Sequence, residues 1–446
     1  AEIVNNQGYA AYQERDLDAA LHEFQAAQEV FQSLLDTLPP GEPRPLRLLE
    51  LIGLSFYNAG NILTTQGRYP EAVEAYERSL EHRKALADAH PSVHRFRQNL
   101  AQTLRELAYV QHETGWSEDG VRSLSQAREL FEALIRNDPD RALLHYEFAR
   151  ALNTLGYIED SRRDHGAAAE AFAQAVAEHR RAIAGGSDSL AYRYELTLSL
   201  ANLAEQAADQ GDLAQALPRY VEAVEEARRL ASAEEAHGAH LETFASVAEP
   251  LGDLRIQAGD ADGAAAAFAD LAATIRESGA SASPGWREDA ALAADARRAA
   301  CLIARGDAEQ GGALLADLEA RARQAEASDA PDPGRLSEIL WLRARAERLR
   351  GRTDEAARAE ADRAALWTES NRDGLVSAAL QAAARACLVG HGRVPLKTPV
   401  GDAARGLDAD RAADDLKLAL DLGYPDRARL RDDPDLTTAL GLASST

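Results

Sequence analysis

Residues 59–76 read AGNILTTQGRYPEAVEAY, in which Gly60, Gly67, Ala72 and Tyr76 stand at fixed spacings. A glycine such as Gly67 permits the left-handed backbone that ends many helices, so a first helix is predicted to end there. Gly60 would lie where that helix crosses a second one, because only a very small residue lets two helix backbones approach closely. Tyr76 of the second helix would then fill the space beside Gly60. The stretch therefore predicts two helices joined by a tight turn.

The same pattern of a small residue, a turn, a second small residue and an aromatic or apolar position recurs along the chain. Successive turns are 52, 48, 48, 48, 48, 47 and 45 residues apart, which chance does not produce. The first helices carry leucines at helical spacing, for example Leu100, Leu104 and Leu107. A helix pair cannot bury its apolar face alone, so the pairs must stack on one another. The other units contain Gly8, Arg15, Ala20 and Phe24; Ala108, Gly115, Gly120 and Leu124; Gly156, Arg163, Ala168 and Phe172; Ala204, Gly211, Ala216 and Tyr220; Gly252, Gly259, Ala264 and Phe268; Ala299, Gly306, Gly311 and Leu315; and Ala344, Gly351, Ala356 and Glu360.

This pattern resembles that of the tetratricopeptide repeat family, and the segment Gly67–Tyr76 matches it closely. The resemblance covers about residues 1–370 and weakens in the last two units, where Leu315 and Glu360 replace the aromatic residue. The period also departs from the usual ~34 residues. Together, the pattern and the resemblance predict an all-α fold over 1–370: a right-handed superhelical solenoid of antiparallel helix pairs, about eight to nine in the whole chain, with a mostly 48-residue period.

Residues 371–446 break the period. We expect a helix over 375–388, a loop over 390–406 and a further helix from Asp408 to Leu422. Asp408 is a residue type that caps helix N-termini, and the helix would have a leucine-rich buried face. This region is therefore predicted to be an interrupted ninth helix pair that serves as a C-terminal cap, with a disordered tail as the alternative.

Three segments resemble a narrower group of proteins. The long repeats of planctomycete-type serine/threonine protein kinases are similar to Ala87–Leu104, and the tail of these kinases is similar to Asp415–Tyr424 and Leu430–Leu436. In those proteins the repeats follow the kinase domain. The resemblance implies a C-terminal regulatory or sensor region of a bacterial kinase whose catalytic domain lies outside this chain. Because the chain begins at Ala1 and contains no Met, we expect it to be a processed or excised piece of a longer protein.

The composition restricts the partners. The chain carries 73 acidic and 49 basic residues, a net charge of −24, and its isoelectric point is about 4.9. Such a charge opposes binding to nucleic acid or anionic lipid, because that binding needs cationic side chains. The sequence contains no transmembrane run and no signal peptide. We expect a cytoplasmic protein, with an upstream anchor or signal left open, whose protein or peptide partner is basic overall.

The search for catalytic or metal-binding motifs finds none. The chain has no Gly-rich phosphate-binding loop, no G-x-S-x-G elbow, no H-E-x-x-H and neither kinase triplet, His-Arg-Asp or Asp-Phe-Gly. The histidine pairs nearest to ligand spacing, His90 with His94 and His237 with His240, are interpreted as solvated loop residues. The two cysteines lie in Ala-rich helical text and are predicted to be buried. These residues therefore predict a non-enzyme without a cofactor or a metal.

In tetratricopeptide folds the first helices line a concave groove, and the resemblance implies that polar residues near the small crossing residue face it. Asparagine offers a donor and an acceptor that match a peptide backbone, and tyrosine adds rigid apolar area with a polar tip. The same asparagines could instead form hydrogen bonds between neighbouring first helices. The residues predicted to bind a partner are Asn58, Asn61, Arg105, Tyr109, Arg150, Asn153, Tyr157 and Asn202.

The leading hypothesis for function is a non-catalytic scaffold that binds a protein or peptide in its groove. We expect docking at about residues 50–210, where Arg105 and Arg150 would form a basic spot for an acidic side chain or a C-terminal carboxylate. Binding to a basic partner should then weaken as salt screens the charges. The alternatives are the kinase regulatory region and a structural assembly subunit, whose self-packing the net charge would oppose at low salt.

Overall fold

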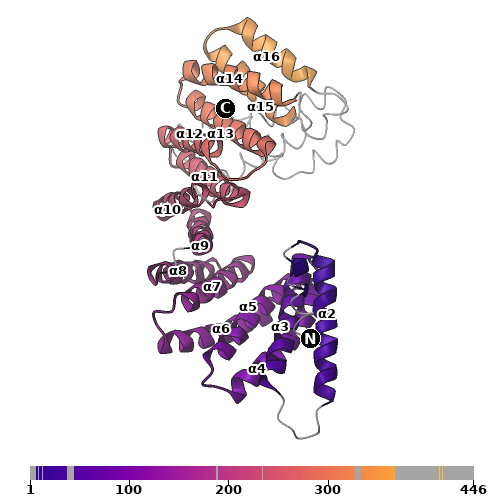
Figure 1. The fold of residues 1–446 in the computed structure, drawn as a ribbon. Coiled ribbons are helices and arrows are strands. Elements are labelled where there is room, and N and C mark those ends of the chain that lie inside the picture. Colours follow the sequence, from indigo (N-terminus) through magenta and orange to yellow (C-terminus); the bar gives the residue numbers. More distant parts are fainter. Residues whose placement is uncertain are drawn as a thin grey trace. The chain divides into compact units, whose positions relative to one another are not determined.

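The computed structural model describes residues 14–37, 45–186, 189–233, 235–326 and 333–366, together with residues 7, 8, 10–12, 411 and 414. Within these residues the regular structure is α-helical, and consecutive helices pack against each other as antiparallel pairs (Figure 1). The predicted all-α architecture of stacked helix pairs is therefore confirmed. None of the helices in the described part of the chain is long and apolar enough to cross a membrane.

The chain divides into two compact units, Ala1–Ser199 and Leu200–Thr446, and the division falls within helix α9 (Leu190–Asp209). The described helices of the first unit are α2 (Leu17–Asp36), α3 (Leu46–Thr65), α4 (Tyr69–Ala89), α5 (His94–Glu113), α6 (Ser117–Asn137), α7 (Ala142–Ser161) and α8 (His165–Ala184). Those of the second unit are α10 (Leu213–Ala231), α11 (Gly238–Gln257), α12 (Ala261–Glu277), α13 (Pro284–Ala304), α14 (Ala308–Glu326), α15 (Pro333–Leu349) and α16 (Thr353–Ala365).

The predicted turn positions all have left-handed backbone. Gly67, for example, has φ of 70°, and the N–H of the next residue, Arg68, donates to the carbonyl of Leu63 at 2.8 Å, which closes the end of α3. Two of the eight turns lack glycine but keep the conformation, with φ of 62° at Arg15 and 64° at Arg163. The turn is therefore set by the helix pair around it. The remaining positive-φ turn glycines are Gly115, Gly211, Gly259, Gly306 and Gly351.

The predicted contact between the small residue and the aromatic residue is also present. A Cβ atom added to Gly60 would lie 2.6 Å from Cε1 of Tyr76, and one added to Gly156 would lie 2.5 Å from Cε1 of Phe172. Both rings are almost completely buried. In both pairs an aromatic side chain of the second helix thus packs directly against the backbone of the first helix.

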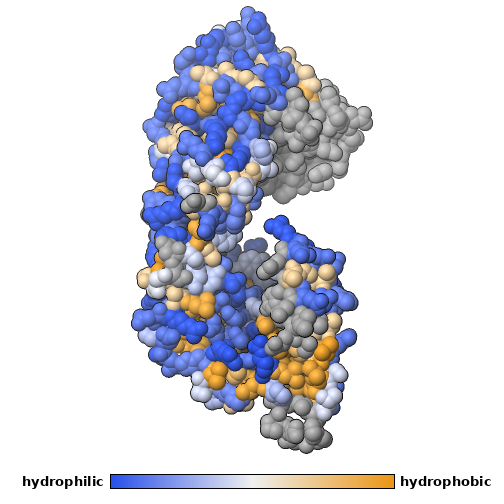
Figure 2. Space-filling model, viewed as in Figure 1, coloured by the Kyte–Doolittle hydropathy of each residue, from blue (hydrophilic) through white to orange (hydrophobic). Residues whose placement is uncertain are grey.

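Within the first unit, the first helices of successive pairs form an inner row. Helix α5 packs against both α3 and α7, and the second helices α4 and α6 lie on the other side (Figure 1). Apolar side chains gather around the C-terminal end of α2 and the N-terminal end of α3 (Figure 2), where Val30, Leu34 and Leu46 are exposed. The inner row is therefore formed by the first helices of neighbouring repeats, which contact one another.

Most of the predicted C-terminal part lies outside the described residues. The expected helix over 375–388, the expected loop over 390–406 and Cys387 are among them, whereas Cys301 is buried on α13, as predicted. Residues 411 and 414 are described and helical. Both belong to the predicted helix from Asp408 to Leu422, and the ninth helix pair stays a prediction.

These two residues contact α15. One amino group of Arg411 lies 2.9 Å from a carboxylate oxygen of Glu338, and the indole N–H of Trp341 donates to Asp414 at 2.8 Å. In the second unit, polar contacts therefore join the last described inner helix to this later stretch of the chain.

Candidate functional site

The residues predicted to bind a partner lie on the inner row or next to it. Helix α3 carries Asn58 and Asn61, and α5 carries Arg105 and Tyr109. Helix α7 carries Arg150, Asn153 and Tyr157, whereas Asn202 lies on the part of α9 that belongs to the second unit. The first seven are therefore on three successive first helices of one compact unit.

The asparagines of the first unit make hydrogen bonds inside the protein. Asn61 accepts from the hydroxyl of Tyr76 at 2.7 Å, and the side-chain amide of Asn153 donates to the hydroxyl of Ser199 at 2.8 Å. Asn58 is buried, with 8% of its surface exposed. Asn153 thus does what the alternative interpretation predicts, because its bond joins the first helix α7 to the first helix α9. Whether these residues also bind a partner stays a prediction.

The predicted basic spot at Arg105 and Arg150 is wrong, because carboxylates neutralise both side chains. Arg105 lies 2.5 Å from Glu106 and 3.8 Å from Glu147, and only 5% of its side chain is exposed. Arg150 lies 3.4 Å from Glu195 and 3.9 Å from Glu147. Burial alone would lower the pKa of the Arg105 guanidinium, but its surroundings, above all the carboxylate of Glu106, hold that pKa above its usual range. Two cations therefore face three anions here.

These side chains connect successive repeats. The Tyr57 hydroxyl donates to Glu106 across α3 and α5 at 3.4 Å. Arg105 then faces Glu147 across α5 and α7, and Arg150 faces Glu195 across α7 and α9. We call the six residues Tyr57, Arg105, Glu106, Glu147, Arg150 and Glu195 the ionic ladder. Its position between first helices gives it a structural role in the inner row.

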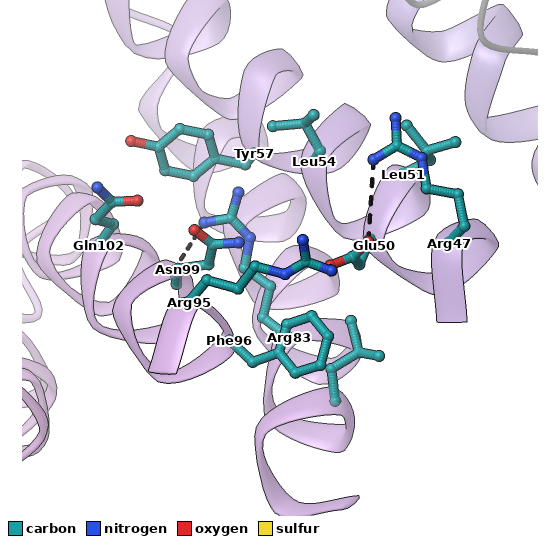
Figure 3. A pocket seen from close by; sticks show the side chains of 11 residues that line it. Arg47, Glu50, Leu51, Leu54, Tyr57, Arg83, Arg95, Phe96, Asn99 and Gln102 are labelled. Atoms are coloured by element: carbon teal, nitrogen blue, oxygen red, sulfur yellow. Dashed lines mark hydrogen bonds and ion pairs between the residues drawn. The ribbon is translucent and has the colours of Figure 1, made fainter. Parts of the chain in front are cut away.

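A surplus of positive charge lies instead in a cavity of about 280 Å³ between α3, α4 and α5, which we call the arginine cavity (Figure 3). The guanidinium groups of Arg47 and Arg95 converge on the carboxylate of Glu50, at 3.9 and 2.6 Å. A third guanidinium, that of Arg83, comes from the second helix α4. The lining residues are Arg47, Glu50, Leu51, Leu54, Tyr57, Arg83, Leu86, Arg95, Phe96, Asn99 and Gln102.

Arg83 is held firmly in the wall of the arginine cavity. Its Nη1 donates to the backbone carbonyl of Asn99 at 2.7 Å and to the hydroxyl of Thr103 at 2.8 Å. Its guanidinium carbon lies 4.3 Å from the centre of the Tyr57 ring, a cation–π contact. Sequence reasoning missed this residue because it considered only first-helix positions. The signal that could have found it is the recurrence of arginines at the start of α3, near the end of α4 and at the start of α5.

Tyr109 and Tyr157 belong to an aromatic cluster near the turn end of the inner row. The Tyr109 ring lies 6.3 Å from Tyr69 and 6.1 Å from Tyr157, and His112 packs edge-on against Tyr157 at 5.3 Å. The Tyr157 hydroxyl donates to Glu113, and 45% of that tyrosine is exposed. The predicted pair of tyrosines is therefore brought together across α5 and α7 and offers accessible aromatic surface.

A buried histidine packs against an aromatic side chain of α7. His179 on α8 is fully buried beside Tyr146, whose ring stacks on Tyr192 at 4.2 Å. Within the described residues neither ring nitrogen of His179 has a hydrogen-bond partner. Burial, assisted by the charge of Arg150, lowers the pKa of His179 to about 3.

His179 should make the first unit sensitive to acid. The unfolded chain takes up a proton on this histidine near pH 6.5, whereas the folded chain holds it neutral down to about pH 3, so stability is lost as the pH falls through that window. Between pH 7.5 and pH 5 we expect a loss of about 2 kcal/mol from this group. Urea denaturation at the two pH values measures it. His179→Leu should remove that part of the dependence, and an unchanged difference would refute the assignment.

The histidine pairs do not form a metal site within the described residues. His90 ends α4 and His94 begins α5, so the two are not on one helix. His237 and His240 stack ring on ring at 3.8 Å at the start of α11, and His240 is buried, contrary to the predicted solvated loop. In the same part of the chain, no group of three His, Cys, Asp or Glu side chains is arranged to hold a metal ion.

The second unit has a cavity of a different character. It measures about 500 Å³ and lies between the inner helices α11, α13 and α15. Its lining includes the carboxylates of Glu242, Glu249, Asp289 and Glu338 and two arginines, so it carries a negative surplus. The positive surplus of the arginine cavity is therefore not a general property of the inner helices.

Comparisons with known proteins give one sequence match and several similar structures. Solved structures similar to this chain include the apo form of the quorum sensor NprR from B. thuringiensis, 11% identical over 82% of this chain and 87% of that chain, with a TM-score of 0.40. BtubC (BKLC) from P. vanneervenii is 14% identical over 56% of this chain and 91% of that one, with a TM-score of 0.39. A tetratricopeptide repeat protein from Parabacteroides merdae is 13% identical over 80% and 98%, with a TM-score of 0.34.

Among curated protein sequences no match to the chain is found. Residues 55–84 match the family described as Tetratricopeptide repeat. They cover most of the α3–α4 helix pair, which is the pair that supplies Tyr57 and Arg83 to the arginine cavity.

Proposed function

We propose that the chain is a protein-interaction scaffold and that the inner face of its first unit binds an extended segment of a partner protein. The observation that carries this proposal is the arginine cavity. Its lining comes from two neighbouring first helices and the second helix between them, and combines guanidinium, amide, aromatic and aliphatic side chains. Binding sites for peptides and small ligands have this composition, in which apolar walls surround a few polar groups that fix orientation.

The aromatic cluster extends the proposed face. Tyr109 and Tyr157 lie on the two first helices after α3 with their ring centres 6.1 Å apart, and 45% of Tyr157 is exposed. Tyrosine anchors bound segments well, because it adds contact area and a hydrogen-bonding tip at a small cost in conformational entropy. An extended segment would place one anionic side chain in the arginine cavity and an apolar side chain against the tyrosines.

The charge of the whole partner should differ from the charge of that one anchoring side chain. With a net charge of −24, the chain attracts basic proteins at long range, and the arginine cavity selects an acidic group at short range. We therefore propose a partner that is basic overall. The affinity of the complex should fall as salt rises, and an affinity that stays flat or increases would show that apolar burial drives binding.

Selection from a displayed peptide library tests the proposed face, because the library itself supplies candidate partner segments. The full chain should enrich peptides that share an acidic residue, and Arg95→Glu should reduce their binding about tenfold or more, because it reverses one charge of the cavity. Arg78→Glu is the matched control, since this exposed arginine lies on α4 and pairs with Glu81. Equal enrichment by the Arg95 variant, or no enrichment at all, would contradict the proposal.

The resemblance of the chain to repeats that follow a kinase domain adds a finer proposal. In that case the partner-binding face would regulate a catalytic domain outside this chain. The text that carries the resemblance at the C-terminus, Asp415–Tyr424 and Leu430–Leu436, lies outside the described residues. The peptide selection described above applies to either form of the scaffold.

A further inference from the structure

The side chains of the arginine cavity carry a formal charge of +2, from three arginines and one glutamate, in a chain whose net charge is −24. From this contrast and from the geometry below, we infer that the cavity binds the phosphate monoester of a phosphorylated side chain in the partner protein. The inference rests on the proposed function only in placing the cavity on the partner-facing side. The recognition chemistry depends on the cavity residues themselves.

Glu50 shows where an anion sits. Its carboxylate lies 2.6 Å from a terminal nitrogen of Arg95 and 3.9 Å from one of Arg47, and both guanidinium groups turn toward it (Figure 3). The side chains of Arg95 and Arg47 are 64% and 68% exposed, so both can turn toward an incoming group. Glu50 therefore occupies an anion position in the protein's own structure, and an incoming anion with more charge would compete with it.

The charge favours a phosphate monoester over a carboxylate. A phosphorylated side chain carries about −1.5 to −2 charges at neutral pH and has three acceptor oxygens. Its charge matches the formal +2 of the cavity side chains more closely than the single charge of a carboxylate does. Guanidinium groups also fit phosphate oxygens with paired hydrogen bonds, which makes arginine clusters suitable for such groups.

The remaining lining suits the carbon part of a side chain. Leu51, Leu54 and Phe96 form apolar wall, and Asn99 and Gln102 add amide groups at its edge. A volume of about 280 Å³ is near the lower limit of ordinary ligand pockets, so the cavity fits a side chain better than a large free ligand. The occupant should therefore combine a phosphate with a short apolar stem or a ring.

Arg83 makes the cavity preorganised. The residue is 5% exposed, and two neutral oxygen atoms, the Asn99 carbonyl and the Thr103 hydroxyl, fix one of its terminal nitrogens. The Tyr57 ring lies against its guanidinium group. A cation that is already fixed loses little conformational entropy when an anion binds, so its charge adds more to affinity than that of a mobile surface arginine.

Titration calorimetry on the full chain at low salt tests the inference with three probes: phenyl phosphate, inorganic phosphate and benzoate. We expect one molecule of phenyl phosphate to bind per chain, more tightly than either other probe. Arg95→Gln should weaken this binding about tenfold, because it removes a charged hydrogen-bond donor. Glu50→Gln should strengthen it several-fold by removing the competing carboxylate. Arg78→Gln is the control and should leave it unchanged.

Three results would overturn the inference. The first is no saturable binding of phenyl phosphate, or binding that Arg95→Gln and Glu50→Gln leave unchanged. The second is benzoate binding as tightly as phenyl phosphate, which would assign the cavity to carboxylates. The third is inorganic phosphate binding equally well, which would indicate a site for free phosphate. Because the probes need no partner, these failures are distinct from failure of the peptide selection, and circular dichroism verifies that each variant is folded.

Discussion

Arg105→Ala is expected to destabilise the first unit by about 3 to 5 kcal/mol, the cost of removing one member of a buried ion pair. The guanidinium is buried between α5 and α7, within 2.5 Å of Glu106 and 3.8 Å of Glu147. The Glu147 side chain is itself only 9% exposed. Removing the cation leaves these carboxylates without their closest compensating charge, and the buried Glu147 has little contact with water to offset the loss. Urea denaturation followed by circular dichroism measures the loss.

A second substitution separates lost charge from lost packing. If the penalty comes from carboxylates left without a nearby cation, adding Glu147→Gln to Arg105→Ala should restore part of the stability. A loss below about 1 kcal/mol for the single variant would mean that the ladder contributes no more than a surface ion pair.

Gly156→Ala is expected to cost about 1 to 3 kcal/mol through overpacking. The added methyl carbon would lie 2.5 Å from Cε1 of Phe172 and within 2.7 Å of two further ring atoms, and the Phe172 side chain is buried. Hydrogen exchange in α7 and α8 should increase in the full chain. The matched control is Gly166→Ala at an exposed position of α8, where the new atom would meet only Asp164 Oδ1 at 3.6 Å. That variant should be neutral or slightly stabilised.

The repeats themselves suggest a compensating change for Gly156→Ala. In the third and seventh units an alanine at the crossing position stands opposite a leucine, as in Ala108 with Leu124 and Ala299 with Leu315. Adding Phe172→Leu should therefore recover part of the stability lost in Gly156→Ala. A single variant as stable as the natural chain would contradict the close approach of helix to ring.

The fold could be predicted because its determinants are local. Each helix pair depends on a turn residue and on two residues that meet across that turn, such as Gly60 and Tyr76, so one repeat contains the signal for its own helix pair. The stacking follows from the recurrence of that signal along the chain. Even at Arg163, which is not glycine, the register alone predicts the position of the turn, and the backbone there is left-handed.

The candidate site was harder to predict because its charges depend on neighbouring repeats. Arg105 and Arg150 look basic in isolation, but Glu147 and Glu195 neutralise them from helices about one period further along the chain. The two glutamates lie 42 and 45 residues after their arginines, short of the 48-residue period, so comparing residues one full period apart does not reveal these pairs. The arginine cavity was missed for a related reason: Arg83 reaches it from a second helix, outside the first-helix positions to which the family resemblance points.

Photocross-linking of a library-selected peptide tests the binding face most directly. A photoreactive residue at Gln102, in the arginine cavity, should cross-link the peptide near its acidic residue, and Arg95→Glu should abolish that product. A photoreactive residue at Glu77, exposed on the second helix α4, serves as the comparison. The account predicts a product from position 102 and none from position 77. Cross-linking from position 77 alone, or a product at 102 that persists in Arg95→Glu, would contradict it.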